Sequence, residues 1–316
     1  MKKILILGGT GFVGHHVCER LERLKWRATV PTRRLASAKG IWMLPMVTPL
    51  EADIHDEAAL ARLVEGHDAV VNLIGVLHGD KATFERVHVD FPRTVARACI
   101  ASGVRRLVHL SALGADPNAP SMYQRSKAQG EGHLHLLGPR LDITILRPSV
   151  MFGRDDNFLN MFATLNRVLP VIPLARANAK FQPVWVQDVA EAILKCLQDK
   201  STIEQTLEAC GPRVWALREL VKLAGRLSGK ERPVIGVPDG IGRLQAFFLG
   251  LLPGEPMMSR DNLDSMKVDN VASGRLPGLS SLGIAPAELE PVVRGYMGPH
   301  SWDNRLIDFR KTAGRY

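Results

Sequence analysis

Short apolar runs alternate with longer amphipathic segments through the first half of the chain. The first run, residues 3–7, is continuously apolar after its lysine, as expected for a strand buried in a parallel sheet. The pattern predicts further strands over 28–30, up to Asp53, and over 69–74, 106–111 and 142–147. It predicts amphipathic helices over 12–25, 56–65, 84–102 and 122–137. This alternation indicates an α/β fold, a doubly wound parallel Rossmann sheet with right-handed crossovers.

The rhythm of the pattern changes after Pro148, and this change divides the predicted domains. Two ranges make up the predicted Rossmann domain, 1–150 and about 179–211. The second range is expected to return to the sheet, with strand and helix signals over 183–186 and 188–198. Proline and glycine interrupt the remaining helical segments, which form a predicted smaller C-terminal substrate lobe from 151–178 and 212–316.

The formal net charge is +9, from 41 lysines and arginines against 32 aspartates and glutamates. This excess suits nucleic acid, an acidic membrane surface or a phosphorylated ligand. Nucleic acid is the least favoured partner, because basic and aromatic residues are not interleaved and no zinc-finger spacing occurs. The stretch 294–316 is predicted to be a poorly ordered basic tail, and it could help the apolar run 244–252 to contact a membrane surface. Packing of that run against the Rossmann domain is the favoured alternative.

The cysteines and the lengths of the apolar runs favour a cytoplasmic protein. Cys18, Cys99, Cys196 and Cys210 are widely spaced and form no C-x-x-C pair, which favours reduced, buried thiols. No apolar run reaches the roughly eighteen residues that a membrane-spanning helix needs. A peripheral position at the inner face of a membrane is the alternative location.

Glycines recur at every third position between the first strand and the first helix. Gly8 permits the tight turn, and Gly11 lets the backbone approach a pyrophosphate at the helix N-terminus. Gly14 allows the helix to pack closely on the strand. The strand–loop–helix context makes this pattern specific for a dinucleotide, whereas the alternative is a plain turn. The predicted contacts from the loop come from Gly8, Thr10, Gly11, Phe12 and Val13.

The end of the second strand indicates which dinucleotide is bound. An acidic residue there accepts hydrogen bonds from the ribose of NAD, but no Asp or Glu occurs between Glu22 and Glu51. Arg33 and Arg34 occupy the expected position, and a guanidinium fits the 2′-phosphate of NADP(H). NADP(H) is therefore the preferred cofactor, and NAD(H) is the alternative. A further alternative is that the two arginines belong to a solvated loop and bind no cofactor.

Two later strand ends are predicted to line the same cofactor site. Asp53 and Ile54 follow the third strand, where a carboxylate can meet the adenine amino group or can instead cap the next helix. Leu73, Ile74 and Gly75 close the fourth strand at the carboxyl edge of the sheet, beside the expected crevice.

A possible catalytic set follows the fifth strand. Tyr123 and Lys127 are four residues apart and share one helix face, and Ser121 has the spacing of an N-cap with Gln124. A nearby ammonium favours tyrosinate and so lowers the tyrosine pKa toward a useful range. Ser111 ends the preceding strand, where it could hold a substrate oxygen. These residues suit hydride and proton transfer at a carbon–oxygen bond, although Tyr123 could be an ordinary helix residue and Lys127 could pair with Glu131.

These motifs resemble the short-chain dehydrogenase/reductase superfamily, in its extended or atypical branch. The resemblance rests on the glycine loop, on Ser111 with Tyr123 and Lys127, and on residues 146–149. More narrowly, residues 152–160, 182–186 and 268–271 are similar to the Rossmann-type accessory subunit of respiratory complex I, its bacterial relatives and epimerase/dehydratase-like proteins.

The resemblance implies a role for each matching residue. It implies that Tyr123 is the general acid/base, that Lys127 binds the nicotinamide ribose, that Ser111 orients substrate and that Pro148 lies near the nicotinamide. It also implies tightly held NADPH with a structural or redox-sensing role. Ser111 is followed by Ala112 and not by an acidic pair, which disfavours sugar dehydration.

Three functions stay open at this point. The first is an NADP(H)-dependent oxidoreductase acting on a small apolar carbonyl or quinone-like substrate. The second is a non-catalytic NADPH-binding accessory or assembly protein that contacts a respiratory complex. The third is a nucleotide-sugar epimerase.

Overall fold

The computed structural model describes residues 1–238, 240 and 259–298. The chain forms two compact units. Unit 1 comprises Met1–Pro148, Val186–Ala209 and Ala272–Ala285, and unit 2 comprises Ser149–Trp185, Cys210–Val271 and Pro286–Tyr316. The expected contact segment 244–252 and the expected tail from 299 onward lie outside the described residues, whereas residues 294–296 belong to a helix.

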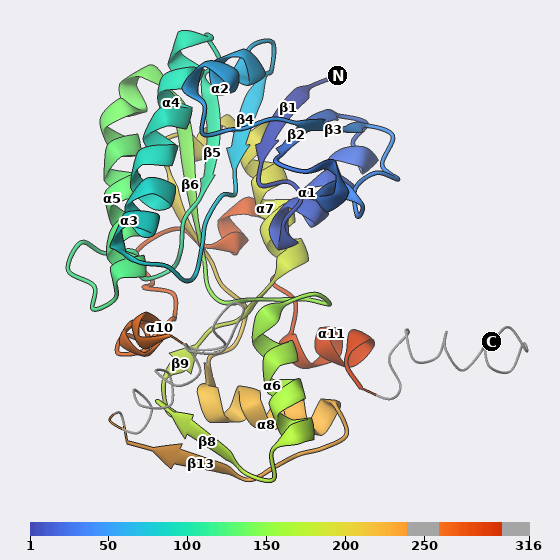
Figure 1. Cartoon of the computed structure of the whole chain (residues 1–316), viewed down its shortest axis with the longest axis vertical. Helices are drawn as coiled ribbons and strands as arrows, with labels where there is room; N and C mark the ends of the chain where they lie inside the picture. The colour runs from blue at the N-terminus through green and yellow to red at the C-terminus, as the bar shows by residue number, and fades with distance from the viewer. Residues whose placement is uncertain (239, 241–258, 299–316) are drawn as a thin grey trace, which may run out of the picture. The chain divides into compact units, whose positions relative to one another are not determined.

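Unit 1 is built on one seven-stranded sheet, in the order β11-β6-β5-β4-β1-β2-β3. Every neighbouring pair is parallel, so the predicted doubly wound α/β sheet is confirmed (Figure 1). The strands are β1 Lys3–Leu7, β2 Arg27–Thr32, β3 Val47–Glu51, β4 Ala69–Asn72, β5 Arg106–Leu110, β6 Asp142–Pro148 and β11 Thr206–Ala209.

The strand expected over 183–186 does not join this sheet. Val184–Trp185 forms β10, which pairs with β7 (Met151–Phe152) in unit 2. The strand that completes the large sheet is β11, which pairs with β6. Its polar Thr206 and Glu208 interrupt the apolar pattern, so hydrophobic periodicity does not reveal it.

Helices cover both faces of the sheet in unit 1. Helices α1 (Phe12–Arg23) and α7 (Val186–Gln198) pack together on one face, and α2 (Glu57–Val64), α4 (Phe91–Ala101) and α5 (Met122–Leu137) lie on the other (Figure 1). The cap prediction for α5 is confirmed, since Ser121 Oγ accepts a hydrogen bond of 3.1 Å from the Gln124 amide. Short 3₁₀ turns occur at Leu35–Ala38 (η1), Gly138–Arg140, Lys200–Thr202 and Leu279–Leu282.

The single helix expected over 84–102 is divided by a wider turn. Helix α3 (Lys81–Phe84) leads into a π-helical segment, η2 (Glu85–Asp90), before α4 begins. Pro92 has no amide hydrogen, so the α-helical bond to the His88 carbonyl cannot form. Gly130 of α5 packs against that same carbonyl, where a Cβ would overlap it. The π turn therefore lies where Gly130 of α5 packs against the backbone of η2.

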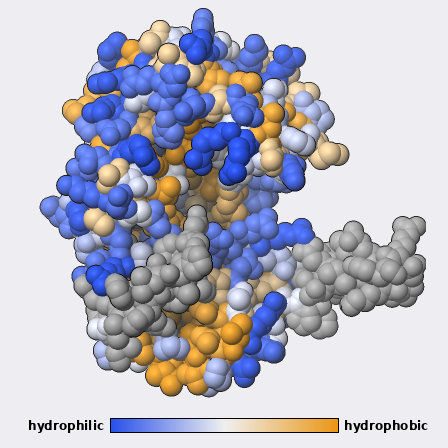
Figure 2. Space-filling model, viewed as in Figure 1, coloured by the Kyte–Doolittle hydropathy of each residue, from blue (hydrophilic) through white to orange (hydrophobic). Residues whose placement is uncertain are grey.

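Unit 2 is a smaller α/β assembly with its own core. Asn166 ties α6 (Asn157–Val168) to α8 (Leu217–Leu227), because its buried amide donates to the Phe162 and Val221 carbonyls. Strand β8 pairs with β13, and β9 pairs with β12. Figure 2 shows apolar side chains gathered at the foot of the view, where Figure 1 places β8 and β13. The remaining elements are β8 Ile172–Ala175, β9 Lys180–Phe181, β12 Trp215–Ala216, β13 Val234–Val237, α10 Arg260–Ser265 and α11 Leu289–Tyr296.

The states of the cysteines and the lengths of the helices can be compared with the expectations from the sequence. All four cysteines are buried and none is disulfide-bonded, as predicted. Among the described residues, no helix has the length and apolar character required to span a bilayer.

Candidate functional site

The glycine loop forms a tight turn between β1 and α1. Gly8 adopts a φ of +87°, a left-handed conformation that favours glycine, and its carbonyl accepts a 3.1 Å hydrogen bond from the Gly11 amide. Gly14 packs directly on this turn, because a Cβ there would overlap the Gly8 carbonyl and the Gly9 Cα. No acidic residue lies in the first turn of α1, so its positive N-terminus faces the loop without a carboxylate.

The ends of β1 and β4 bring two predicted segments together. A Cβ on Gly8 would lie 3.2 Å from Ile74 Cδ1 and 3.3 Å from the Leu73 backbone. These strands are neighbours in the sheet, and the strand order reverses between them. In open α/β sheets, ligands bind in the crevice at such a switch point, outside the carboxyl ends of the strands. The loop and the 73–75 segment therefore lie together at the switch point.

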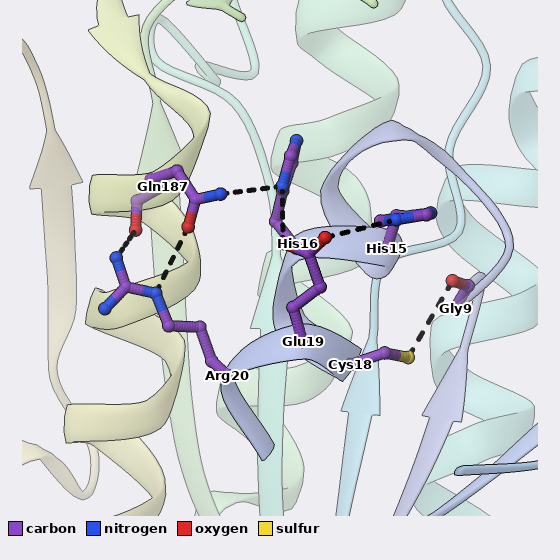
Figure 3. A network of polar contacts seen from close by, with 7 residues as sticks. All are labelled: Gly9, His15, His16, Cys18, Glu19, Arg20 and Gln187. Atoms are coloured by element: carbon purple, nitrogen blue, oxygen red, sulfur yellow. Dashed lines mark hydrogen bonds and ion pairs between the residues drawn. The ribbon is translucent and has the colours of Figure 1, made fainter. Parts of the chain in front are cut away.

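Contacts between α1 and α7 hold the helix that follows the loop (Figure 3). His16 Nδ1 lies 2.9 Å from Gln187 Nε2, and Arg20 Nε donates to Gln187 Oε1 at 3.2 Å. Arg20 also forms an ion pair with Glu191 of α7. The body of α1 is thus fixed by polar contacts to α7, and no side chain caps its N-terminus.

Arg33 and Arg34 follow β2 and are both exposed. Thr32 Oγ1 donates to the Arg34 carbonyl at 3.1 Å, which fixes the backbone where the strand ends. No hydrogen bond or ion pair joins the Arg33 side chain to another residue in the described ranges. The Arg33 guanidinium is therefore available for a ligand.

Asp53 does not cap the next helix, so that alternative is wrong. Helix α2 begins at Glu57, and Asp56 is its cap, accepting hydrogen bonds from the Ala58 and Ala59 amides. Asp53 Oδ1 instead accepts from the His55 amide at 2.9 Å, which closes a turn ahead of the helix. Its neighbour Ile54 is buried in the core of unit 1.

Lys127 reaches from α5 to the ends of two central strands. Its ammonium donates to the Leu110 carbonyl at 3.2 Å, and a Cβ on Gly75 would lie 3.2 Å from Nζ. Burial lowers the pKa of Lys127 to about 8, with the charge of Glu131 acting in the opposite direction. Glu131 does not hydrogen-bond Lys127, because both of its oxygens accept from Arg147, with Nε at 2.9 and 3.2 Å.

Ser111 and Tyr123 complete the predicted set in unit 1. The Ser111 hydroxyl is buried immediately after β5, and within the described part of the chain it has no hydrogen-bond partner. A buried hydroxyl without a partner is uncommon and marks a place where a ligand can complete the hydrogen bonding. Tyr123 lies in the first turn of α5, and burial raises the pKa of its hydroxyl above the usual value. The expected lowering by a nearby ammonium is therefore wrong, because burial outweighs any charge beside this hydroxyl.

Comparisons with known proteins agree with this arrangement. The model of the NAD dependent epimerase/dehydratase family matches residues 4–209. The chain belongs to this family. Family members bind a dinucleotide cofactor, and the fold is the Rossmann-like fold of its NAD-binding members.

The relatives of this chain carry names that describe different roles. Subunit 9 of the NADH dehydrogenase [ubiquinone] 1 alpha subcomplex from Mus musculus mitochondria is 33% identical over 296 residues, covering 90% of this chain and 77% of its own length. Ceramide reductase from Caulobacter vibrioides is 26% identical, covering 75% and 74%. The solved dTDP-glucose 4,6-dehydratase DesIV from Streptomyces venezuelae, which holds NAD, has a TM-score of 0.66 at 22% identity, covering 75% and 84%.

A dinucleotide fits the residues of this family member. The N-terminus of α1, which has no acidic residue and no side-chain cap, and the Cβ-free approach at Gly11 suit a pyrophosphate. The Gly8 turn contacts the end of β4. The unsatisfied Ser111 hydroxyl and the cation at Lys127 lie at the ends of the central strands, the position expected for the nicotinamide half.

His88 joins the site although the sequence did not single it out. The Val76 amide donates to His88 Nε2 at 3.1 Å, so the neutral ring carries its hydrogen on Nδ1 and donates it to Ser126 Oγ at 2.9 Å. Ser126 Oγ in turn donates to the Tyr123 carbonyl at 2.8 Å. His88 thus links the turn after β4 to the backbone of Tyr123. Burial and the charge of Lys127 lower the pKa of His88 to about 2, which keeps the ring neutral.

A second buried histidine, His109, is also affected by the charge of Lys127. His109 Nδ1 is 3.2 Å from Asn72 Nδ2, and its Nε2 has no partner among the described residues. Burial and Lys127 lower the pKa of His109 to about 3. A single histidine in an apolar strand or helix is most often an ordinary core residue, so the sequence pattern offered no reason to assign His88 or His109 to the site. The signal that could have drawn attention to His88 is the Pro92 that breaks the regular helix.

Replacing Lys127 by methionine is expected to stabilise the protein. The folded-state pKa of about 8 lies below the ordinary value of 10.5, so the unfolded chain binds more protons between these two values. The buried cation therefore costs stability in full below about pH 8, and stability rises with pH up to about 10.5. Lys127→Met should raise the free energy of unfolding at pH 7 by about 1–3 kcal/mol and remove that rise.

Urea unfolding at pH 7 and at pH 10 gives the free energy of unfolding of the variant and of the wild type, and the difference between the two proteins at each pH measures the cost of the buried cation. Lys200→Met is the matched control, because Lys200 is exposed and its removal should leave the pH slope unchanged. A Lys127→Met protein less stable than wild type at pH 7 would show that Lys127 is stabilising.

Proposed function

We propose that this chain is an NADP(H)-dependent oxidoreductase that acts on a small apolar carbonyl or quinone-like compound. The observation that carries the proposal is the buried, unpartnered Ser111 hydroxyl on the β5 end that also holds Lys127. A site built for turnover keeps such groups available for substrate and cofactor, whereas a purely structural site satisfies them internally.

The proposed roles follow from charge and protonation. The nicotinamide supplies the hydride when it is bound. Ser111 donates a hydrogen bond to the substrate oxygen, and Tyr123 donates the proton to that oxygen as the hydride reaches carbon. The raised pKa of Tyr123, caused by burial, keeps its phenol protonated before reaction. Pro148 ends β6 in the same unit, where the nicotinamide is expected.

The proposed preference for NADP(H) rests on Arg33 and Arg34. Both side chains are exposed after β2, and no acidic residue between Glu22 and Glu51 is present to bind the ribose of NAD. Asp53, Ile54 and the loop residues Thr10, Phe12 and Val13 complete the proposed adenine and pyrophosphate contacts.

Changing Arg33 to serine is expected to weaken NADPH binding about 10- to 100-fold and to leave NADH binding unchanged. The reason is the loss of charge-assisted hydrogen bonds to the 2′-phosphate, a group that NADH lacks. Isothermal titration calorimetry with both nucleotides measures it, with the exposed Arg62→Ser as control. Equal affinities of the wild type for NADPH and NADH would reject the proposed preference.

The substrate class is proposed from one relative. The relative's name, ceramide reductase, describes the reduction of a lipid. The apolar segment 151–162, in contrast, packs into the core of unit 2. The test follows NADPH absorbance while the wild type is offered a panel of alkyl ketones, aldehydes and quinones. Oxidation of NADPH with one of them supports the proposal, and none across the panel opposes it.

A second candidate function is a non-catalytic NADPH-binding accessory or assembly protein. It is favoured by the 33% identity to a mitochondrial complex I subunit. In that case contact with a respiratory complex, at the inner face of a membrane, would be the role and turnover would be dispensable. An epimerase is the third candidate, supported by the family description and by the tyrosine that such a reaction also uses.

A further inference from the structure

A basic stretch without acids runs along one side of unit 1. From residue 23 to residue 50 the chain contains six lysines and arginines and no aspartate or glutamate. These residues comprise the end of α1, all of β2, η1, the loop 39–46 and most of β3. The six cations are all exposed: Arg23, Lys25, Arg27, Arg33, Arg34 and Lys39.

Large apolar side chains are exposed within the same stretch. Trp42 is 55% exposed and Met43 is 87% exposed, and Leu24, Leu35 and Leu50 are also exposed. These five belong to the thirteen large exposed hydrophobics of the described residues, although the stretch is under a tenth of the chain. Such enrichment in one short stretch is the pattern of a surface that meets a partner.

The fold gathers these residues at the open edge of the sheet. Strand β3 is the last strand, and β2 is its neighbour in the sheet. The loop 39–46 returns along this edge: Gly40 lies against the His15 ring, and the Met46 carbonyl accepts from the Ala28 amide at 2.9 Å. Ile41 is buried and anchors the loop, so the adjacent Trp42 and Met43 project outward. Figure 1 draws this segment in blue beside β2 and β3.

We propose that this edge surface, the exposed side chains between Arg23 and Leu50, docks unit 1 on an anionic lipid bilayer. Trp42 and Met43 enter the interfacial region of the bilayer, where tryptophan is enriched in membrane proteins. Arg23, Lys25, Arg27 and Lys39 contact anionic headgroups, which attract clustered cations near a membrane surface, and Arg33 and Arg34 are left to the proposed cofactor site. Of the neighbouring acids, Glu22 accepts from the Met46 amide at 2.7 Å and pairs with Lys25 at 3.7 Å, so it offsets one of the six cations. Glu51 follows the surface at the end of β3.

Two features favour lipid over a protein partner. Pro49 lies within the exposed edge strand and cannot donate a backbone hydrogen bond, which opposes pairing with a strand from another chain. The side chains that carry charge between residues 23 and 50 are all basic, and the exposed apolar side chains occur at four separate places, Leu24, Leu35, Trp42 with Met43, and Leu50. This arrangement suits a fluid headgroup layer better than the contiguous apolar centre of a protein interface.

Vesicle co-sedimentation of the full chain tests the proposal. Vesicles of equal parts phosphatidylglycerol and phosphatidylcholine should bind the wild type at low salt, and vesicles of phosphatidylcholine alone should not. Trp42→Ser with Met43→Ser should weaken binding at least about tenfold, and Lys25→Glu with Lys39→Glu should abolish it. Leu136→Ser is the matched control, because Leu136 is 79% exposed on α5 and lies outside this surface.

Each variant should retain the wild-type melting temperature and the wild-type affinity for NADPH, which separates docking from folding and from the cofactor site. Brominated phosphatidylcholine in the anionic vesicles should quench wild-type tryptophan fluorescence and should not quench that of Trp42→Ser. Equal binding by the Trp42/Met43 variant and the wild type would overturn the proposal. So would loss of binding on deletion of 299–316 alone, or binding that favours an acidic protein over the vesicles.

Discussion

Tyr123→Phe is expected to reduce NADPH oxidation roughly 10²–10⁴-fold, the usual contribution of a positioned proton donor. The substitution removes one hydroxyl and keeps the ring, so the edge contacts to Phe84 and His88, with centroids 6.2 and 5.4 Å away, remain. The Ser126–Tyr123 backbone bond is also unaffected. Stability and NADPH affinity should therefore stay close to wild type. Steady-state kinetics with the best compound of the carbonyl and quinone panel, beside calorimetry with NADPH, measures both quantities.

Tyr296→Phe is the matched control for this experiment. The ring of Tyr296 is partly buried, and its hydroxyl donates to Asp156 Oδ2 at 3.1 Å at the N-cap of α6 in unit 2. We expect this variant to lose stability and to keep turnover. Turnover that survives Tyr123→Phe would remove this residue as the proton donor. Turnover lost with the biological role intact would favour the accessory function over the catalytic one.

Gly14→Ala is expected to abolish NADPH binding and to lower the free energy of unfolding by about 3 kcal/mol. An added Cβ would overlap the Gly8 carbonyl and the Gly9 Cα, so α1 would have to move away from the end of β1. Overpacking against backbone is costly because backbone cannot rotate aside as a side chain can. The loop would lose the geometry that faces the pyrophosphate. Thermal unfolding and calorimetry with NADPH measure the two effects.

Gly11→Ala separates binding from folding at the same loop. A Cβ at Gly11 would meet only the Gly8 carbonyl, at 3.3 Å, and the φ of Gly11 is −84°, which any residue adopts. The melting temperature should change by no more than about 2 °C, while the methyl group blocks the approach of the pyrophosphate and weakens NADPH binding. If both variants bound NADPH as the wild type does, the cofactor would not lie on this loop.

Much of the fold was predictable because its signals are local. The apolar run 3–7, the glycines that follow it and the Ser121 cap each act over a few residues, and the structure places β1, the Gly8 turn and α5 there. The strand β11 was missed because its polar positions hide the pairing with β6, which only the folded sheet supplies. The assignment of 183–186 to the large sheet was wrong for the same reason, since pairing partners are not visible in a local pattern.

The sequence by itself determined the Rossmann sheet and the glycine loop and supplied the residues proposed for hydride transfer, because hydrophobic period and motif spacing are properties of neighbouring residues. The tertiary structure decided which of these residues meet. It paired Glu131 with Arg147 and left Lys127 beside Leu110 and Gly75. It also turned His88 toward Ser126 through a π turn that no regular periodicity describes. These are contacts between distant segments, and their energies depend on burial that arises only when the sheet and its helices close around them.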